Sequence, residues 1–145
     1  MQAINECCKK VKKDYLKFFK KEKIFNKSNV RKMNNLKNFY APISFWINNK
    51  CKKKGNTLIL GLSGSQGSGK TTTGNILKLV LKKFFKKNVF VISIDDFYKT
   101  LKARNILSKN KHLLFQTRGV PATHDINLVK NFFNLIKKKK FKKIK

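Results

Sequence analysis

Apolar residues recur at helical spacing along much of the chain. In residues 1–38 they form one stripe among lysines, whose members are Ile4, Cys8, Val11, Tyr15, Phe18 and Phe25. Three-and-four spacing also runs from Gly69 to about residue 85, through 98–107, and from Asp125 to 136. Because one face of an α-helix repeats every 3.6 residues, these patterns predict amphipathic helices.

The region between the first two helical patterns is mixed. Residues 39–47 form a dense apolar patch interrupted by Pro42, and residues 48–56 are polar and basic. The patch predicts a short helix and the polar stretch a connector.

Two short runs are apolar almost throughout. Residues 57–62 lie between Gly55 and a glycine-rich loop, and residues 89–94 consist largely of β-branched and aromatic residues. Such runs are typical of strands covered on both faces. With the helix between them they predict a βαβ unit.

Length and composition favour one folded domain. The chain has 145 residues, of which 41% are hydrophobic and 12% aromatic, too many for a purely disordered polypeptide. No apolar run approaches the roughly 20 residues that span a bilayer, and the N-terminus lacks the basic-then-apolar order of a signal peptide. We therefore expect a cytoplasmic protein without a membrane span. Cys7, Cys8 and Cys51 have no zinc-ligand spacing, so we expect free thiols.

The net charge of +30 makes a polyanion the first partner to consider. However, only three of the 36 basic residues are arginine, the residue that base-reading proteins favour. Lysine is accompanied by many Asn, Ile and Phe residues, which share AT-rich codons with it, so compositional bias accounts for the charge. Nucleic acid is not expected as a specific partner. A basic module for nucleic acid or membranes stays open as an alternative, and the stripe in 1–38 suits either an anionic membrane or the protein's own core.

One loop carries a specific chemical motif. Residues 64–71 satisfy the pattern G-x-x-x-x-G-K-[ST] of the P-loop, or Walker A motif, between a predicted strand and a predicted helix. Glycines let successive backbone N–H groups surround phosphate oxygens at the helix N-terminus. Lys70 supplies a charge to the β- and γ-phosphates, and Thr71 supplies a hydroxyl ligand for Mg²⁺. The motif predicts an α/β fold with a P-loop NTPase-type parallel sheet and flanking helices.

Two carboxylates follow the second predicted strand. Asp95 and Asp96 stand at its carboxyl end, where ligands of open α/β sheets bind. A carboxylate there can accept the proton of an attacking hydroxyl or help to hold a metal ion. Two acids that cap a helix start explain the same position equally well.

Three ordered segments carry a family resemblance. The P-loop, then Ser-Ile-Asp-Asp-Phe-Tyr at 93–98, then Arg-Gly-Val-Pro-Ala-Thr-His-Asp at 118–125 resemble the D-glycerate 3-kinase family and its bacterial and fungal P-loop kinase relatives. The patch at 40–47 also resembles a segment of the bacterial relatives. A more distant likeness is to the phosphoribulokinase, uridine kinase and pantothenate kinase group.

The resemblance implies cofactors, a small-molecule substrate and site residues. The cofactors are ATP and Mg²⁺, and the acceptor is a hydroxy acid such as D-glycerate or another alcohol. Lys70 and Asp95 would be catalytic, with Asp95 as the base, and Thr71 and Asp95 would hold the metal. The ATP-binding residues would be Gly64, Ser65, Gln66, Gly67, Ser68, Gly69, Lys70, Thr71 and Thr72. The acceptor side would comprise Asp96, Tyr98, Arg118, His124 and Asp125.

Two departures from the family pattern matter. Ala122 replaces the usual glycine of R-G-x-x-G-T-H-D, which strains the loop if that position needs a positive φ. Family members also continue for about as long again, with further strands and an acidic motif, so we expect a truncated sheet. We expect a basic extension at 1–38, the N-terminal half of a P-loop kinase domain at 39–136 and a lysine-rich tail at 137–145. An active small-molecule kinase and an inactive remnant of one both remain open.

Overall fold

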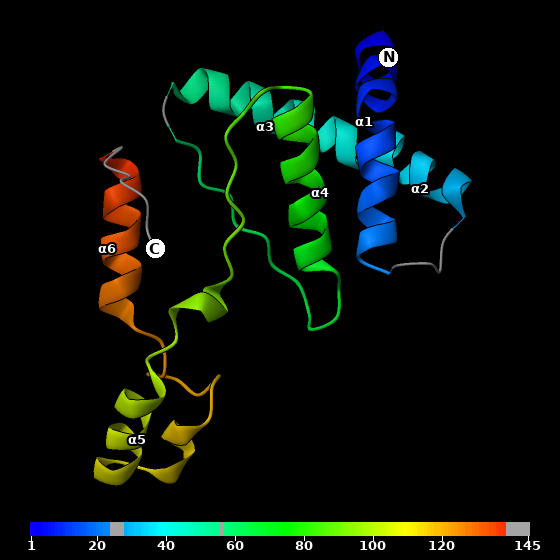
Figure 1. Ribbon diagram of the computed structural model, residues 1–145. Helices are drawn as coiled ribbons and strands as arrows, with labels where there is room; N and C mark the ends of the chain where they lie inside the picture. The colour runs from blue at the N-terminus through cyan, green and yellow to red at the C-terminus, as the bar shows by residue number, and fades with distance from the viewer. Residues whose placement is uncertain (24–27, 56, 139–145) are drawn as a thin grey trace. The chain divides into compact units, whose positions relative to one another are not determined.

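The computed structural model describes residues 1–23, 28–55 and 57–138, and about 68% of them are helical (Figure 1). The chain divides into two compact units, Met1–Val91 and Ile92–Lys145, here called the N-terminal and C-terminal units. The boundaries expected at 38/39 and 136/137 stay predictions. No helix in the described part of the chain combines the length and the apolar character needed to cross a membrane.

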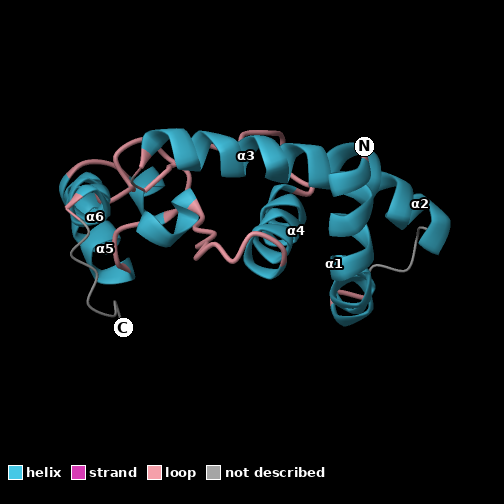
Figure 2. Cartoon of the chain, turned by 90° about the horizontal axis from the view of Figure 1, so that it is seen from above, coloured by secondary structure: helices cyan, strands magenta, loops and turns pink. Residues whose placement is uncertain are grey.

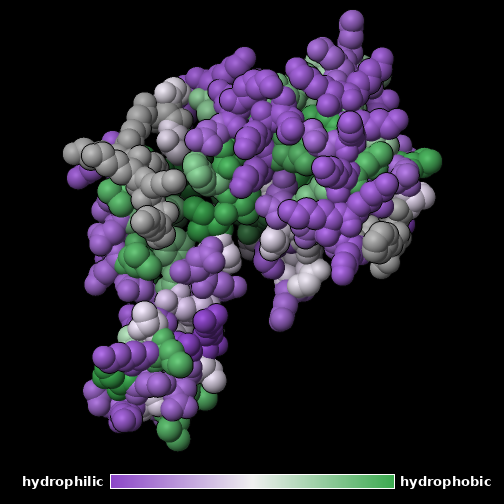
Figure 3. Space-filling model, viewed as in Figure 1, coloured by the Kyte–Doolittle hydropathy of each residue, from purple (hydrophilic) through white to green (hydrophobic). Residues whose placement is uncertain are grey.

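The N-terminal unit contains α1 (Gln2–Lys21), α2 (Asn29–Asn35), the π-helical turn η1 (Leu36–Tyr40), α3 (Ala41–Lys54) and α4 (Lys70–Lys83). The helices α1, α3 and α4 contact one another, and Figure 2 shows α3 crossing both of the others. An ion pair joins α4 to α1, between Lys83 Nζ and Asp14 Oδ2 at 3.1 Å. The face in view in Figure 3 is mostly hydrophilic, with hydrophobic patches between the polar side chains.

The stripe predicted in residues 1–38 packs on the protein's own core. One face of α1 is buried against Leu36, Ala41 and α4; the buried residues of α1 are Cys7, Cys8, Val11, Tyr15 and Phe19. Ile4 and Phe18 are partly buried beside them, and Phe25 lies outside the described residues. Burial raises the pKa of the Cys7 thiol to about 12 and also raises that of Cys8. Both thiols therefore stay protonated at neutral pH.

The predicted connector at 48–56 is wrong over most of its length, because α3 continues to Lys54. The helix ends where Gly55 adopts a φ of 69° and its N–H donates to Cys51 O at 3.2 Å. Helices α2, η1 and α3 follow one another without a break. The wider π turn precedes Pro42, whose ring and missing N–H disturb regular α-helical hydrogen bonding.

The predicted α/β fold with a parallel sheet is also wrong. Residues 57–62 and 89–93 form no regular secondary structure, and the only β-pairing among the described residues is an isolated bridge between Tyr98 and His124. Many side chains of these segments are exposed, including Leu62 at 51% and Phe90 at 75%. A run of apolar β-branched residues indicates only a local preference for strand conformation. A sheet also needs a second strand, from elsewhere in the chain, to form hydrogen bonds with it.

The C-terminal unit contains η2 (Ile94–Phe97), α5 (Leu101–Asn110), η3 (Leu113–Gln116) and α6 (Ile126–Lys137), of which η2 and η3 are single 3₁₀ turns. The predicted helices at 98–107 and from Asp125 are confirmed, with α5 beginning three residues later than expected. Thr100 caps α5 by accepting from the Ala103 N–H at 3.2 Å. No strand forms at the second predicted position, 89–94, and its last residue, Ile94, begins η2.

Candidate functional site

The glycine-rich loop at 64–69 leads directly into the first turn of α4. Gly67 and Gly69 have φ values of 74° and 80°, which L-residues rarely adopt. A Cβ at either position would meet no atom within 4 Å, so backbone conformation, and not crowding, requires glycine there. At Gly64 a Cβ would lie 2.8 Å from Ser68 Oγ, so this glycine permits a close approach across the loop.

The side chain of Lys70 folds back over the loop. Its ammonium group donates to Gly64 O at 2.8 Å and to Ser65 O at 2.7 Å. The lysine charge is thereby held beside the loop at the N-terminus of α4, where the positive end of the helix dipole also lies. Two positive features therefore meet at one place.

Several backbone N–H groups at the start of α4 have no acceptor among the described residues. The Ser68 N–H donates to Ser65 O at 3.3 Å, and the Thr73 N–H donates to Gly69 O at 2.8 Å. Among the described residues, the N–H groups of Gly69, Lys70, Thr71 and Thr72 donate to no protein atom. Such N–H groups at a helix start bind phosphate oxygens, so the loop residues fit a nucleotide phosphate chain.

The other loop residues are open to solvent. Ser65, Gln66 and Ser68 are exposed, as is Thr71 in the first turn of α4, while Thr72 is half-buried. The Thr71 hydroxyl is a hard oxygen donor of the kind that Mg²⁺ takes together with phosphate oxygens. Its exposure leaves it accessible to such an ion.

The two neighbouring carboxylates have different surroundings. Asp96 and Ser93 form a capping box on η2: Ser93 N–H donates to Asp96 Oδ2 at 3.0 Å, and the Asp95 N–H donates to Ser93 Oγ at 3.2 Å. The helix-capping interpretation therefore holds for Asp96. The exposed Asp95 carboxylate has no hydrogen bond or ion pair with any described residue. Asp95 is thus the carboxylate left available for chemistry.

Three residues expected on the acceptor side come together. The rings of Tyr98 and His124 stack with centroids 4.1 Å apart, and the Arg118 guanidinium lies 5.8 Å from the Tyr98 centroid. Two backbone hydrogen bonds flank the stack, from Lys99 N–H to Thr123 O at 2.9 Å and from Asp125 N–H to Phe97 O at 2.8 Å. His124 Nε2 is buried and has no hydrogen-bonding partner in the described part of the chain. The cluster thus presents a cation and an unused ring nitrogen.

The remaining acceptor-side residue has a structural task. Asp125 is the N-cap of α6, and its Oδ1 accepts from the Leu128 N–H at 2.9 Å. Ala122, three residues before this cap, has a φ of 72°. Its position therefore does need the left-handed conformation that suits glycine, and the strain expected from the sequence is present.

Sequence reasoning missed Arg104, a buried arginine whose partners lie next to Tyr98 and close to Arg118 in the sequence. This side chain is only 6% exposed, and its guanidinium donates to Lys99 O and to Gln116 O. Arg104 thereby joins α5 to Lys99, just before the helix, and to Gln116, two residues before Arg118. An available signal was its type, because an arginine is rare in this lysine-dominated chain.

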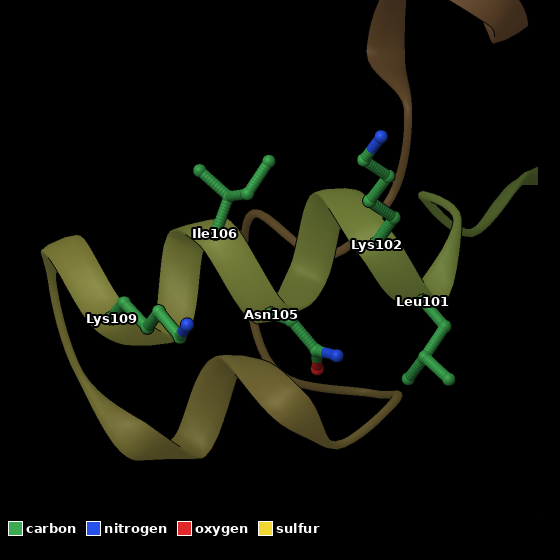
Figure 4. A pocket seen from close by; sticks show the side chains of 5 residues that line it. All are labelled: Leu101, Lys102, Asn105, Ile106 and Lys109. Carbon is green, nitrogen blue, oxygen red and sulfur yellow. The ribbon is translucent and has the colours of Figure 1, made fainter.

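A shallow pocket lies elsewhere, along the outer face of α5 (Figure 4). All its lining side chains come from that helix; they are Leu101, Lys102, Asn105, Ile106 and Lys109. None of them belongs to the predicted site. The predicted residues instead form two groups, residues 64–72 in the N-terminal unit and residues 95–125 in the C-terminal unit.

Comparison with known proteins finds kinases among the relatives. The chain is 36% identical over 104 residues to an uncharacterized kinase of Schizosaccharomyces pombe, covering 70% of this chain and 37% of that protein. It is 39% identical over 103 residues to a probable ATP-dependent kinase of Saccharomyces cerevisiae, with shares of 67% and 33%. The chloroplastic D-glycerate 3-kinase of Arabidopsis thaliana is 34% identical over 104 residues, with shares of 64% and 23%.

The chain is a partial relative of P-loop kinases. This confirms the resemblance seen in the three ordered motifs. The chain spans about a quarter to somewhat over a third of the length of these three relatives. No protein-family model matches the chain, and no solved structure matches it significantly.

Proposed function

We propose that the chain binds ATP through the loop at 64–72 and transfers a phosphoryl group to the hydroxyl of a small molecule such as D-glycerate. The observation that carries the proposal is the loop itself. It combines the left-handed Gly67 and Gly69, the ammonium of Lys70 and the unpaired N–H groups at the start of α4. The names of the relatives, which include an ATP-dependent kinase and a D-glycerate 3-kinase, support the same activity.

In this proposal each part of the loop meets a different need of the triphosphate. The N–H groups of residues 69–72 donate to phosphate oxygens. Lys70 exchanges its two carbonyl acceptors for oxygens of the β- and γ-phosphates, where its charge offsets the charge of the transferring group. Mg²⁺, held by the Thr71 hydroxyl, would supply positive charge to the same phosphates.

The acceptor side is proposed to use the residues around the Tyr98 and His124 stack. Asp95 takes the proton of the attacking hydroxyl, because its carboxylate is exposed and pairs with no described residue. Arg118 lies beside the stack and can bind a carboxylate through two parallel hydrogen bonds. Asp96, Tyr98, His124 and Asp125 shape and hold this cluster.

One observation favours a second function, nucleotide binding without phosphoryl transfer. Segments 57–62 and 89–93 form no sheet among the described residues, although the first leads into the loop and the second precedes Asp95. Without such pairing, the catalytic residues lack the rigid support that transfer requires. This alternative retains the ATP loop and gives up the chemistry.

Calorimetric titration with ATP and Mg²⁺ tests the binding step, with Lys70→Ala as the key variant. Loss of a charge-assisted contact should weaken affinity by roughly tenfold to a hundredfold. The matched control is Lys82→Ala, which removes the same charge from an exposed position near the far end of α4. Equal affinities for the wild type and both variants would contradict the role of the loop.

Adding D-glycerate to the same samples separates the two functions. Phosphorylated product that depends on both Lys70 and Asp95 supports the kinase, with Asp95→Asn as the second variant. Binding that depends on Lys70, with no product from D-glycerate, pantothenate or uridine, supports nucleotide binding alone.

A further inference from the structure

Arg104 is a buried cation whose charge has no acidic partner among the described residues. Its side chain is only 6% exposed, and it forms no ion pair with any of them. A buried charge without a carboxylate beside it is unfavourable, and an apolar residue of similar size would fill the same space at a lower free energy. The two hydrogen bonds from its guanidinium, to Lys99 O and Gln116 O, are therefore what an arginine adds at this position.

The two bonds of Arg104 lead toward Tyr98 and Arg118. Lys99 O, which accepts from Arg104 Nε at 3.3 Å, belongs to the residue directly after Tyr98. Gln116 O, which accepts from Arg104 Nη1, belongs to the residue two positions before Arg118. One planar guanidinium thus bonds to both chain segments that supply the contact between the Arg118 guanidinium and the Tyr98 ring, 5.8 Å from its centroid.

His124 is connected to the same bonds through Lys99. The Lys99 N–H donates to Thr123 O at 2.9 Å, and Thr123 directly precedes His124. The Thr123 side chain is fully buried, and its hydroxyl donates to Val120 O at 2.6 Å. Lys99 is therefore held on one side by Arg104 and on the other by the segment that carries His124. A change at Arg104 should be felt at each of the three clustered side chains.

The Arg118 guanidinium is not itself fixed by a hydrogen bond. It lies beside the Tyr98 ring and donates to no atom of the described residues. Its direction therefore depends on the backbone that carries it, which Arg104 anchors two residues earlier. Direction matters here, because a guanidinium binds a carboxylate through two parallel hydrogen bonds only when the two planar groups are aligned.

We propose that Arg104 is a positioning residue that orients Arg118 toward the carboxylate of a hydroxy-acid acceptor. This inference rests on the proposed function and deepens it, because it makes a carboxylate-bearing acceptor the preferred class over a neutral alcohol. Arg104 touches no substrate and acts only through the segments that it joins. Lysine cannot replace it, since a single ammonium nitrogen lacks the fork of N–H groups that reaches two separate carbonyls.

Steady-state kinetics of the full chain with D-glycerate and with glycerol, a neutral alcohol of similar size, test this role. Arg104→Lys should raise KM for D-glycerate about tenfold, while kcat and the KM for glycerol stay close to those of the wild type. The matched control is Arg31→Lys, the same change at an exposed position on α2. Equal changes for the two acceptors, or no change, would overturn the proposal, because a loosened fold affects acid and alcohol alike.

A double-mutant comparison separates positioning from general stability. Arg118→Lys should also raise KM for D-glycerate, and Arg104→Lys should add little in that background, because its effect passes through Arg118. Additive increases would contradict the proposal. If Arg104→Lys folds poorly by circular dichroism, Arg104→Met takes its place, since it keeps an unbranched side chain in the buried space and removes both hydrogen bonds.

Binding followed by NMR tests the inference without turnover. The chain has two histidines, so the imidazole signals of His124, which stacks on Tyr98, are readily followed. D-glycerate should shift these signals in the wild type, should need about tenfold higher concentration in Arg104→Lys, and glycerol should shift them in neither. Such binding without any product would contradict the proposed function and leave the positioning role standing. No shift in the wild type, or equal affinity in the variant, would overturn the positioning role itself.

Discussion

The N-terminal unit and the C-terminal unit are each stabilised internally by a different kind of contact. In the N-terminal unit one apolar cluster joins three helices, and Tyr15, Val11 and Ile76 within it are fully buried. In the C-terminal unit Phe97 is the one buried hydrophobic residue among those described, and polar groups such as Arg104 and Thr123 are buried instead. Apolar burial is non-directional and tolerates small shifts of the packed side chains. Hydrogen bonds to particular carbonyl oxygens have preferred distances and angles, so they fix the positions of the groups that they join. The cluster of Tyr98, Arg118 and His124 lies in the unit that is held by the directional contacts.

The apolar character of the N-terminal unit predicts the largest effect. In Tyr15→Ala the cluster loses a ring that packs edge-on against Phe19 at 5.0 Å, so the free energy of unfolding should fall by about 3–5 kcal/mol. Urea denaturation followed by circular dichroism measures the loss. In the control Tyr15→Phe only the hydrogen bond to Lys32 O is lost, at a cost of about 1 kcal/mol. Equal losses in the two variants would show that the ring is not part of a packed core.

The directional contacts of the C-terminal unit predict a smaller and local effect. Arg104→Ala leaves two carbonyl oxygens without their donor, which should cost about 1–3 kcal/mol. Hydrogen exchange should accelerate at the N–H groups of Lys99 and Asp125 and stay unchanged in α1 and α4. Arg31→Ala is the control, because Arg31 is exposed on α2. Uniform acceleration through both units would contradict the difference between them.

The strained backbone at Ala122 predicts the smallest effect on stability, and here the substitution should stabilise the protein. Ala122→Gly relieves an L-residue at a φ of 72° and should stabilise the C-terminal unit by about 0.5–1 kcal/mol. Slower hydrogen exchange at Asp125, which follows this loop, would report the gain. The same change in the helix, Ala103→Gly in α5, should destabilise by about 1 kcal/mol. Destabilisation in both variants would mean that Ala122 is not strained.

Features that depend on interactions between residues close in sequence were predicted well, and features that depend on distant residues were not. Helix α4 and the loop before it were predicted closely, because the glycines, Lys70 and the apolar periodicity act within one or two turns. For Asp95 and Asp96 the sequence left catalysis and capping open. The structure separates them, since only the Asp96 carboxylate reaches Ser93 N–H. The sheet was predicted from the same kind of local pattern and failed.

The sequence by itself determined where most helices lie, the glycine-rich loop with the P-loop residue pattern at 64–71 and the partial relationship to P-loop kinases. All of these depend on residue types at fixed short spacings. The tertiary structure decided that segments 57–62 and 89–93 form no sheet with any described residue, that His124 stacks on Tyr98 and that Arg104 bonds to Gln116 near Arg118. These outcomes depend on contacts between residues well separated along the chain, and such contacts form only when packing and hydrogen bonding exceed the entropy cost of bringing them together.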